Sequence, residues 1–444
     1  MGVWAAMAVV TGEAISLGIF LTPAGMAKSL GSPALIGAVW CGMALVTLAG
    51  TLCFSELAIR NPQDGGEYLY LYRGFGARVA FLYGWMAAVV MYPGVAAALC
   101  VGVAPYVSAL VALPVWVVKA LPAVLLIAAG ALNYCGARLS GGVMTALNWL
   151  KAPVLVGLVG WALFSGHATV ANLEPWTLRR AGFGAISPDP LIGAIAGAAV
   201  SAYFCFGGWW EAGKIAGQVR NPERVLPVAF TGGVLLVSAL YLLVSLAFVA
   251  VVPLGSIGSD TAFVARFGQA LFGAAGGRVL AAIVVLCVVG GLMVLTMVVP
   301  RVTFALASAE SSTGPLGMFA RMHPQFRTPA NAVLLQTAVA LAVLLLGAFD
   351  RILAFIVFSS VVFLALTVAT LFREVVPVRR WWFPVAPVVF LAGCAVLALL
   401  LLVHSPMPAV IGAAIVLAGL PVRAVLLRSG KSAARAAEVL SADS

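Results

Sequence analysis

Two ionisable residues, Glu13 and Lys151, lie well inside long apolar segments of this 444-residue chain. A charged side chain at membrane depth is costly, so it usually marks a substrate or ion pathway or a proton relay. A carboxylate and an ammonium group there can pair with each other, bind a charged solute or carry a proton. Glu211 and Lys214 form a second set, about one helical turn apart, which we expect to pair or to face the cytoplasmic exit.

Glu13 and Lys151 each allow two interpretations. Glu13 lies about 15 Å along the first apolar segment, near the middle of the membrane, at ~1.5 Å per residue. A buried carboxylate needs a partner or a proton. Glu13 therefore pairs with Lys151 or acts as a proton site, or else it is a polar residue facing the cytoplasmic vestibule. Lys151 can also extend its ammonium group to the interface, since a span end lies within about two turns.

Two apolar segments are interrupted by glycine and small polar residues at matching places, residues 12–20 and 204–211. Glycine lowers the cost of non-helical backbone. Irregular backbone at membrane depth survives only where it lines a cavity or is buried in protein. One such interruption alone could be a glycine kink for close helix packing. Two at corresponding positions of two halves indicate the substrate site of a secondary transporter.

The elements that must position these residues are membrane-spanning helices. The chain is 63% hydrophobic and 9% charged, whereas a soluble protein carries about 25% charged residues. At roughly 20 residues per span, the sequence predicts an all-α integral membrane protein of about twelve transmembrane helices. We place them near residues 3–27, 34–58, 79–112, 115–133, 142–165, 190–217, 226–252, 275–308, 330–348, 352–373, 382–403 and 406–427.

Charge predicts the orientation of these helices. If both termini lie on one side, 17 of the 25 Lys and Arg residues fall on that side and seven on the other. The richer side should be cytoplasmic, so we expect a multi-pass protein of the inner membrane with cytoplasmic termini. The net charge of +11 then reflects topology, and no soluble basic face for nucleic acid is seen. Apolar sequence begins almost at Met1, so we expect a missing cytoplasmic leader rather than a signal peptide.

Other classes of function find little support in the residues. The seven cysteines show no metal-ligand or disulfide spacing, and the three histidines share no cluster. We therefore expect no metal, no cofactor and no catalytic residues. An integral membrane enzyme would need clustered His, Asp, Ser or Cys at membrane depth. A channel would need rings of polar residues along a pore.

The chain divides into two similar halves. Residues 1–165 hold spans one to five, and residues 190–373 hold spans six to ten, each half opening with an interrupted span. An odd number of spans per half inverts the second half relative to the first, which predicts a 5+5 inverted repeat with the site between the two opening helices. Residues 382–427 add two peripheral spans, and residues 429–444 form a cytoplasmic tail.

Several short motifs, taken in order, resemble one known family over residues 8–335. They are Gly18-Ile19-Phe20 with Pro23; Phe54-Ser55-Glu56-Leu57 with Gly65-Gly66-Glu67-Tyr68; Phe81 to Trp85; Phe204-Cys205-Phe206-Gly207-Gly208-Trp209; Arg220-Asn221-Pro222-Glu223-Arg224; and His323-Pro324 with Thr328-Pro329-Ala330-Asn331-Ala332. The chain resembles the amino acid–polyamine–organocation superfamily, and most of all bacterial relatives of the L-type amino acid transporters. That resemblance implies the leucine-transporter-like fold with broken helices 1 and 6.

The resemblance also implies a substrate site. The first break would bind the substrate carboxylate through backbone amides, and the sixth-span break would receive the amino group through backbone carbonyls. Carried over by position, the first set is Ser16, Leu17 and Gly18, flanked by Ile15 and Ile19. The second set is Phe204, Cys205 and Phe206, followed by Gly207, Gly208 and Trp209, with Phe204 capping the substrate.

This chain departs from the family pattern at two positions. Ser16 stands where the family has its first glycine, and Leu17 stands where it has a small residue. The leucine removes a hydroxyl group from the carboxylate site and adds bulk, although backbone amides could still serve. Lys151 matches a fifth-span lysine that in relatives occupies the ion position of sodium-coupled members. It would replace sodium, hold the first break in place, or carry a proton.

The function that follows is secondary active transport of amino acids, small-molecule substrates, across the bilayer by alternating access. We expect neutral amino acids and a sodium-independent mechanism, by exchange or proton coupling, with Lys151 and Glu13 in coupling or gating. A cationic amino acid or polyamine carrier is the alternative, for which Glu13 and Glu211 are the candidate acids. The outer loops hold no cysteine, so no disulfide-linked partner is expected. Residues 54–72 form a cytoplasmic gate or, equally, a solvated charged loop.

Overall fold

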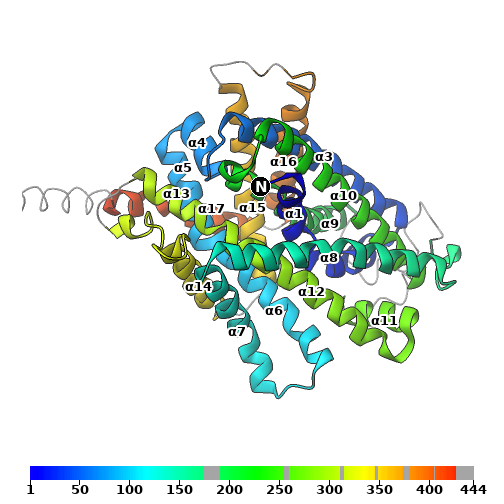
Figure 1. The fold of residues 1–444 in the computed structure, drawn as a ribbon. Helices are drawn as coiled ribbons and strands as arrows, with labels where there is room; N and C mark the ends of the chain where they lie inside the picture. The colour runs from blue at the N-terminus through cyan, green and yellow to red at the C-terminus, as the bar shows by residue number, and fades with distance from the viewer. Residues whose placement is uncertain are drawn as a thin grey trace, which may run out of the picture.

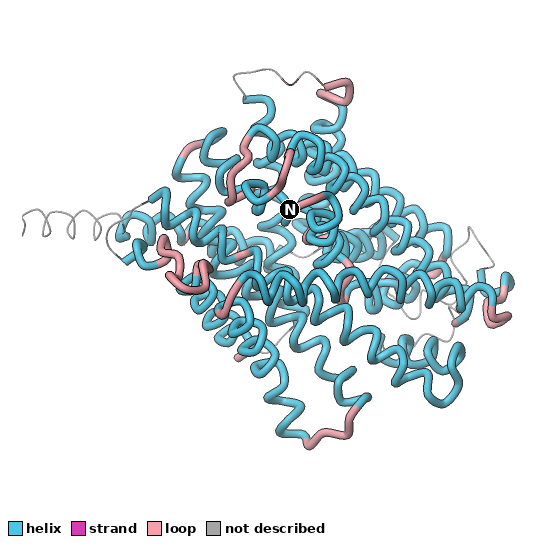
Figure 2. The backbone as a smooth tube through the Cα atoms, in the orientation of Figure 1, coloured by secondary structure: helices cyan, strands magenta, loops and turns pink. Residues whose placement is uncertain are grey.

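The computed structural model describes residues 1–173, 191–253, 260–310, 315–345, 349–373, 378, 380–404 and 406–426. Over these residues the backbone consists of helices and connecting loops (Figure 2). The predicted tail, residues 429–444, lies outside the described residues, as does most of the connection before the sixth span. The predicted all-α membrane class is confirmed.

The helices of the first half follow one another with short connections. Their bounds are α1 Val3–Ala14, α2 Gly18–Leu30, α3 Pro33–Arg60, α4 Glu67–Phe75, α5 Ala77–Met86, the π-helical turn η1 Ala87–Met91, α6 Tyr92–Leu110, α7 Val115–Tyr134, α8 Ala137–Phe164 and the 3-10 turn η2 Val170–Leu173. Helices α5, η1 and α6 run on as a single span of 34 residues, Ala77–Leu110.

The elements after the first half are also helices joined by loops. Their bounds are α9 Leu191–Phe206, η4 Trp209–Gln218, α10 Pro222–Val251, α11 Asp260–Phe272, η6 Gly273–Ala275, α12 Gly276–Val298, α13 Pro300–Glu310, η7 Pro315–Met318, α14 Ala330–Leu344, α15 Phe349–Ala369, η8 Thr370–Arg373, α16 Val385–His404 and α17 Pro406–Leu417. Helix α11 lies in a stretch that the sequence places between spans.

Among the described residues, nine helical segments are long and apolar enough to cross a membrane. The bent pair formed by α1 and α2 makes a tenth. Two shorter apolar helices, Ala330–Leu344 and Val357–Arg373, coincide with the predicted ninth and tenth spans. Each of the twelve predicted ranges therefore contains apolar helix. The 5+5 inverted relation of the two halves stays a prediction.

The first span is broken at the predicted place. Helix α1 ends at Ala14, and Ile15 leaves the helical region with φ −76° and ψ 79°. Helix α2 begins at Gly18, and the two half-helices meet at an angle of 53°. The first amide groups of any helix have no acceptor within the helix, so the start of α2 turns N–H donors toward the break.

The sixth span is also broken at the predicted place. Helix α9 ends at Phe206, and the Gly207 amide donates to the Phe204 carbonyl at 3.1 Å. Gly208 adopts φ +97°, a left-handed conformation that glycine adopts without strain. The span then continues as the 3-10 segment η4, which is interrupted by a kink at Ile215, where φ is −114° and ψ is 18°.

The two broken spans lie side by side near the centre of the bundle. Helix α1 packs against η4 as well as α10, α12 and α8, and α2 packs along α9. Figure 1 shows α1 at the middle of the view, with α9, α10 and α12 around it. Each half of the first span therefore contacts the opposite half of the sixth, which brings the two breaks together.

Candidate functional site

Lys151 holds the end of the first half-helix. Its Nζ donates to the carbonyl of Gly12 at 2.7 Å, and the side chain is fully buried. Glycine at position 290 makes this possible, since a Cβ there would lie 2.7 Å from Lys151 Nζ. The carbonyls in the last turn of a helix lack partners within it. Lys151 thus satisfies one with a charge-assisted hydrogen bond.

Tyr241 of α10 ties the two breaks to each other. Its hydroxyl group lies within hydrogen-bond distance of two carbonyls, those of Ala14 and Cys205, the second at 2.7 Å. A hydroxyl has one hydrogen to donate, so the two carbonyls share it. Ala14 ends α1 and Cys205 lies in the last turn of α9. One side chain therefore binds the same end of both half-helices.

A second contact joins α2 to α9. The Cys205 thiol donates to the Thr22 hydroxyl, with 2.9 Å between sulfur and oxygen. A Cβ at position 18 would lie 2.7 Å from Cys205 Sγ, so Gly18 is required for this close approach. Cys205, predicted as a substrate contact, thus also holds the sixth break against the first.

Glu13 does not pair with Lys151, so the predicted pairing is wrong. The Lys151 ammonium group is directed to the Gly12 carbonyl, and the Glu13 side chain turns instead toward the sixth break. A Cβ at position 208 would lie 2.8 Å from Glu13 Cδ. Glu13 Oε2 is buried and has no hydrogen-bond partner. Neighbouring residues of a helix project about 100° apart, which separates Glu13 from the side where Lys151 approaches.

Two adjoining cavities have Glu13 in their walls. One, of about 20 Å³, is lined by residues of both breaks and of α6: Glu13, Ala14, Ser16, Gly18, Val95, Leu99, Phe204, Cys205 and Gly207. The other, of about 30 Å³, lies beside it and is lined by Glu13, Met91, Val95, Tyr203, Phe204, Gly207, Trp210, Val357 and Ser360. Phe204 borders both, which suits its predicted role as a cap. The structure thus brings part of both predicted sets to one cavity: Ser16 and Gly18 of the first, and Phe204, Cys205 and Gly207 of the second.

The two residues that depart from the family pattern have different surroundings. Leu17 is fully buried and packs against α6, where a Cβ at position 102 would lie close to its Cδ2. Because Gly102 has no side chain, there is room for the leucine. Leu17 is not among the residues that line the Glu13 cavities. Ser16 does line one of them, and its hydroxyl is buried without a hydrogen-bond partner. Ile15 and Ile19 are fully covered by the apolar core.

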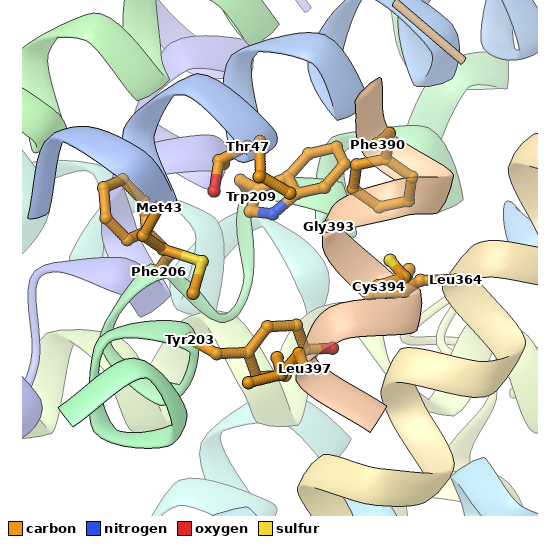
Figure 3. Close-up of a pocket in the computed structure, with 11 residues that line it drawn as sticks. Met43, Thr47, Tyr203, Phe206, Trp209, Leu364, Phe390, Gly393, Cys394 and Leu397 are labelled. Carbon is orange, nitrogen blue, oxygen red and sulfur yellow. The ribbon is translucent and has the colours of Figure 1, made fainter. Parts of the chain in front are cut away.

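Two predicted site residues, Phe206 and Trp209, face a different cavity. This cavity, of about 40 Å³, lies between α3, α9, α15 and α16, and its wall is almost entirely apolar. Figure 3 shows Phe206, Trp209 and Tyr203 around it, with Phe390 and Cys394 contributed by α16. Tyr203 also borders the cavity of Glu13, so its ring stands between the two spaces.

The ionisable residues after the sixth break form a buried cluster. Lys214 Nζ lies 2.8 Å from Glu211 Oε1 and 3.0 Å from Glu67 Oε1. The Tyr92 hydroxyl donates to Glu211 at 2.9 Å. All three charged side chains are at most 1% exposed. The expected pairing of Glu211 with Lys214 is confirmed, and a second carboxylate joins it.

Sequence reasoning misses the part that Glu67 plays. The sequence places Glu67 in a gate or a solvated loop, yet its side chain is buried on Lys214. The turn before it explains this, because the Gly65 amide donates to the Lys214 carbonyl at 3.1 Å. A Cβ at position 66 would lie 2.7 Å from Lys214 Cγ. The pair of glycines is the signal in the sequence, since it allows α4 to dock directly on η4.

The rest of the 54–72 segment is held by ion pairs and a tyrosine. Glu56 pairs with both Arg60 and Arg380, at 2.9 and 2.8 Å. The Tyr70 hydroxyl lies 3.4 Å from the Gly213 carbonyl, and burial raises the pKa of this phenol well above its usual value. Tyr70 therefore remains a hydrogen-bond donor. The segment is docked on the bundle, and the alternative of a loop in free solvent is wrong.

Broken helices side by side, with a cavity between the breaks and charged groups held at membrane depth, define a polytopic membrane transport protein. Within the described residues, no group of three or more His, Cys, Asp or Glu residues could hold a metal ion. Residues 1–421 match the family model described as "Amino acid permease". The chain belongs to this family, whose members are transporters and not enzymes.

The chain is similar to curated transporters along nearly its whole length. It is 26% identical to the serine/threonine exchanger SteT of Bacillus subtilis (strain 168), over 95% of each chain. It is also 26% identical to the Asc-type amino acid transporter 1 of Mus musculus, over 95% of this chain and 80% of that one. The large neutral amino acids transporter small subunit 2 of Oryctolagus cuniculus is 26% identical over 95% of this chain and 79% of its own.

Proposed function

We propose that this permease carries amino acids across the inner membrane by alternating access, without sodium. One observation carries the proposal: the two broken spans enclose a cavity, and Lys151 holds the end of the first with its ammonium group at 2.7 Å from the Gly12 carbonyl. A fixed cation at this place supplies the positive charge that a bound sodium ion would otherwise provide. The helix end then needs no metal ion to keep its geometry.

The substrate is expected to be a neutral amino acid. The relatives named above are described as handling serine and threonine, or large neutral amino acids. The start of α2 presents amide groups that suit a carboxylate. Glu13 is the observation that favours the second candidate, a cationic amino acid or amine, because it places a carboxylate without a partner in the same cavity.

Uptake by the purified protein in liposomes tests the proposal. A panel of labelled amino acids is offered with sodium or potassium outside, with and without a pH gradient, and with and without unlabelled amino acid inside. Sodium-independent uptake of neutral amino acids supports the proposal. Stimulation by internal substrate indicates exchange, and stimulation by a pH gradient indicates proton coupling. Uptake that requires sodium, or no uptake of any amino acid, contradicts it.

Both termini are proposed to lie on the cytoplasmic side, as the excess of Lys and Arg predicts. The N-terminus packs near the end of η4, where the Arg220 amide donates to the Met1 carbonyl at 2.9 Å. Reporter fusions to the C-terminus, active on one side of the membrane only, test this orientation. Activity of a periplasmic reporter would contradict it.

A further inference from the structure

Glu13 is a carboxylate with no fixed cation, at the boundary between the two breaks. Its Oε2 has no hydrogen-bond partner, and its side chain borders both central cavities. A buried carboxylate in this condition is costly unless a proton or a cation joins it. The groups around Glu13 determine which of these the site receives.

The charges around Glu13 leave one negative charge unmatched. The ionisable groups that act on it from the packed elements are Glu211 and Lys214 of η4, Glu67 of α4 and Lys151 of α8. Lys214 is committed to Glu211 and Glu67, and Lys151 is committed to the Gly12 carbonyl. Three carboxylates thus face two ammonium groups when all are ionised. A single added positive charge would balance the set.

The backbone carbonyls near the cavity are largely engaged elsewhere. Those of Ala14 and Cys205 share the Tyr241 hydroxyl, the Phe204 carbonyl accepts from Gly207, and the Gly12 carbonyl accepts from Lys151. These are the groups from which an amino-group site would be built. Two side-chain groups that line the cavity have no hydrogen-bond partner, Glu13 Oε2 and the Ser16 hydroxyl, and of these Glu13 is the acid.

We propose that Glu13 binds the ammonium group of the transported solute by direct ion pairing, so that a primary ammonium group is the recognised feature. This deepens the proposed function, on which it rests, by naming the chemistry at one end of the substrate. The other end meets only the Ser16 hydroxyl and the amides at the start of α2, with no cation lining that cavity. The site therefore accepts an amine that lacks a carboxylate, but not a carboxylate that lacks an amine.

Three matched compounds test this selectivity. They are the amino acid of the panel with the strongest uptake, its decarboxylated amine and its deaminated acid. Binding is measured by competition on the purified protein, and transport by uptake into liposomes. The amine is expected to compete within about ten-fold of the amino acid, whereas the acid should not compete. Competition by the acid but not by the amine would overturn the proposal.

Glu13→Gln keeps the shape of the side chain and removes its charge. It should weaken binding of the amino acid and of the amine by roughly ten-fold or more, because hydrogen bonds to charged groups contribute more than neutral ones. Glu13→Asp keeps the charge on a shorter side chain and should weaken binding less. The matched control is Glu223→Gln, the same chemical change at an exposed position at the start of α10. Size-exclusion profiles and melting temperatures show which variants fold.

The outcomes separate this proposal from the proposed function. If no amino acid is bound but the amine binds and Glu13→Gln abolishes that binding, amino acid transport fails and the role of Glu13 stands. If amino acids are transported and Glu13→Gln leaves their affinity unchanged, the role of Glu13 fails alone. A variant that loses only stimulation by a pH gradient, with affinity intact, would make Glu13 a proton site and overturn the proposal. Sodium-dependent binding lost in the variant would also overturn it.

Discussion

The two breaks are similar in sequence, but the charged residues near them differ in their partners. At the first, the buried ammonium group of Lys151 serves the backbone, and the carboxylate of Glu13 is left open to a cavity. At the sixth, Lys214 lies between Glu211 and Glu67, and Tyr92 adds a hydrogen bond, so every charged residue of the cluster has a partner. Tyr241 joins one break to the other.

This difference indicates that the two breaks have separate roles. In the cluster after the sixth break each charged residue has an ion-pair partner, although Glu211 Oε2 and Glu67 Oε2 have no hydrogen-bond partner, and the ion pairs fix the position of η4 against α4. A buried acid without a partner lowers stability, yet it can bind a solute. Natural proteins depart from full satisfaction of buried polar groups at functional sites. On the proposal made above, Glu13 at the first break binds the ligand, whereas the cluster after the sixth break holds η4 in place.

Removal of Lys214 should give the largest loss of stability. Lys214→Ala leaves the Glu211 and Glu67 carboxylates buried without a cation, and such a change costs about 3–5 kcal/mol. The melting temperature of the purified protein in detergent should fall sharply. Lys119→Ala removes an exposed lysine from α7 and serves as the control. Recovery of stability in the triple variant Lys214→Met, Glu211→Gln, Glu67→Gln would show that unpaired charge is the cause. An unchanged melting temperature for Lys214→Ala would contradict the account of the cluster.

Removal of Lys151 should have a smaller effect on stability and a large effect on transport. Lys151→Met leaves the Gly12 carbonyl without its charged donor, a loss of about 2 kcal/mol. Uptake should fall because the end of α1 is no longer fixed. Gly290→Ala is an independent route to the same result, since its Cβ would lie 2.7 Å from Lys151 Nζ. Full transport by both variants would show that this hydrogen bond does not position the first break.

Loss of the Tyr241 hydroxyl should weaken the link between the two breaks. Tyr241→Phe deprives two carbonyls of the hydrogen they share, which should cost about 1–2 kcal/mol. The halves of the two spans should then move apart more readily, so proteolysis or cysteine labelling near the breaks should increase. Tyr72→Phe, at an exposed position of α4, is the matched control. Equal labelling of the two variants would mean that Tyr241 does not hold the breaks together.

The spans and the location of both breaks could be predicted from the sequence. Long apolar runs require a membrane or a buried core, and glycines in the middle of such runs favour irregular backbone at that depth. The sequence could not predict that Lys151 donates to the Gly12 carbonyl. This hydrogen bond depends on Gly290, which lies 139 residues further along the chain than Lys151 and makes room for its ammonium group. Helical order alone places Glu13 and Lys151 at similar depth, but it does not say on which side of α1 Lys151 approaches.

Glu67 and Tyr241 are harder still to find from the sequence. Glu67 stands in a stretch of mixed charge, and only the docking of the Gly65-Gly66 turn on Lys214 makes it a buried partner. Tyr241 is one of several hydroxyl-bearing residues in an apolar span that also holds Thr231, Ser238 and Ser245, and a tyrosine there is commonly part of the packing. Its function becomes visible only when α1 and α9 are both placed beside α10. The roles of Glu67 and Tyr241 depend on contacts between spans that are distant in sequence, and no local sequence pattern predicts those contacts.

The contact between Thr22 and Cys205 should have the smallest effect of the ties between the breaks. A thiol is a weak donor, and Thr22→Val replaces the hydroxyl with a methyl group of similar volume. Thr22 is 8% exposed, so little water solvates its hydroxyl in the folded protein. Stability should change by less than about 0.5 kcal/mol, and uptake should remain near that of the parent protein. If Thr22→Val instead lowered stability as strongly as Tyr241→Phe, close packing of α2 on α9 would matter less than this one hydrogen bond. The contacts that hold the two breaks together would then involve both halves of the first span.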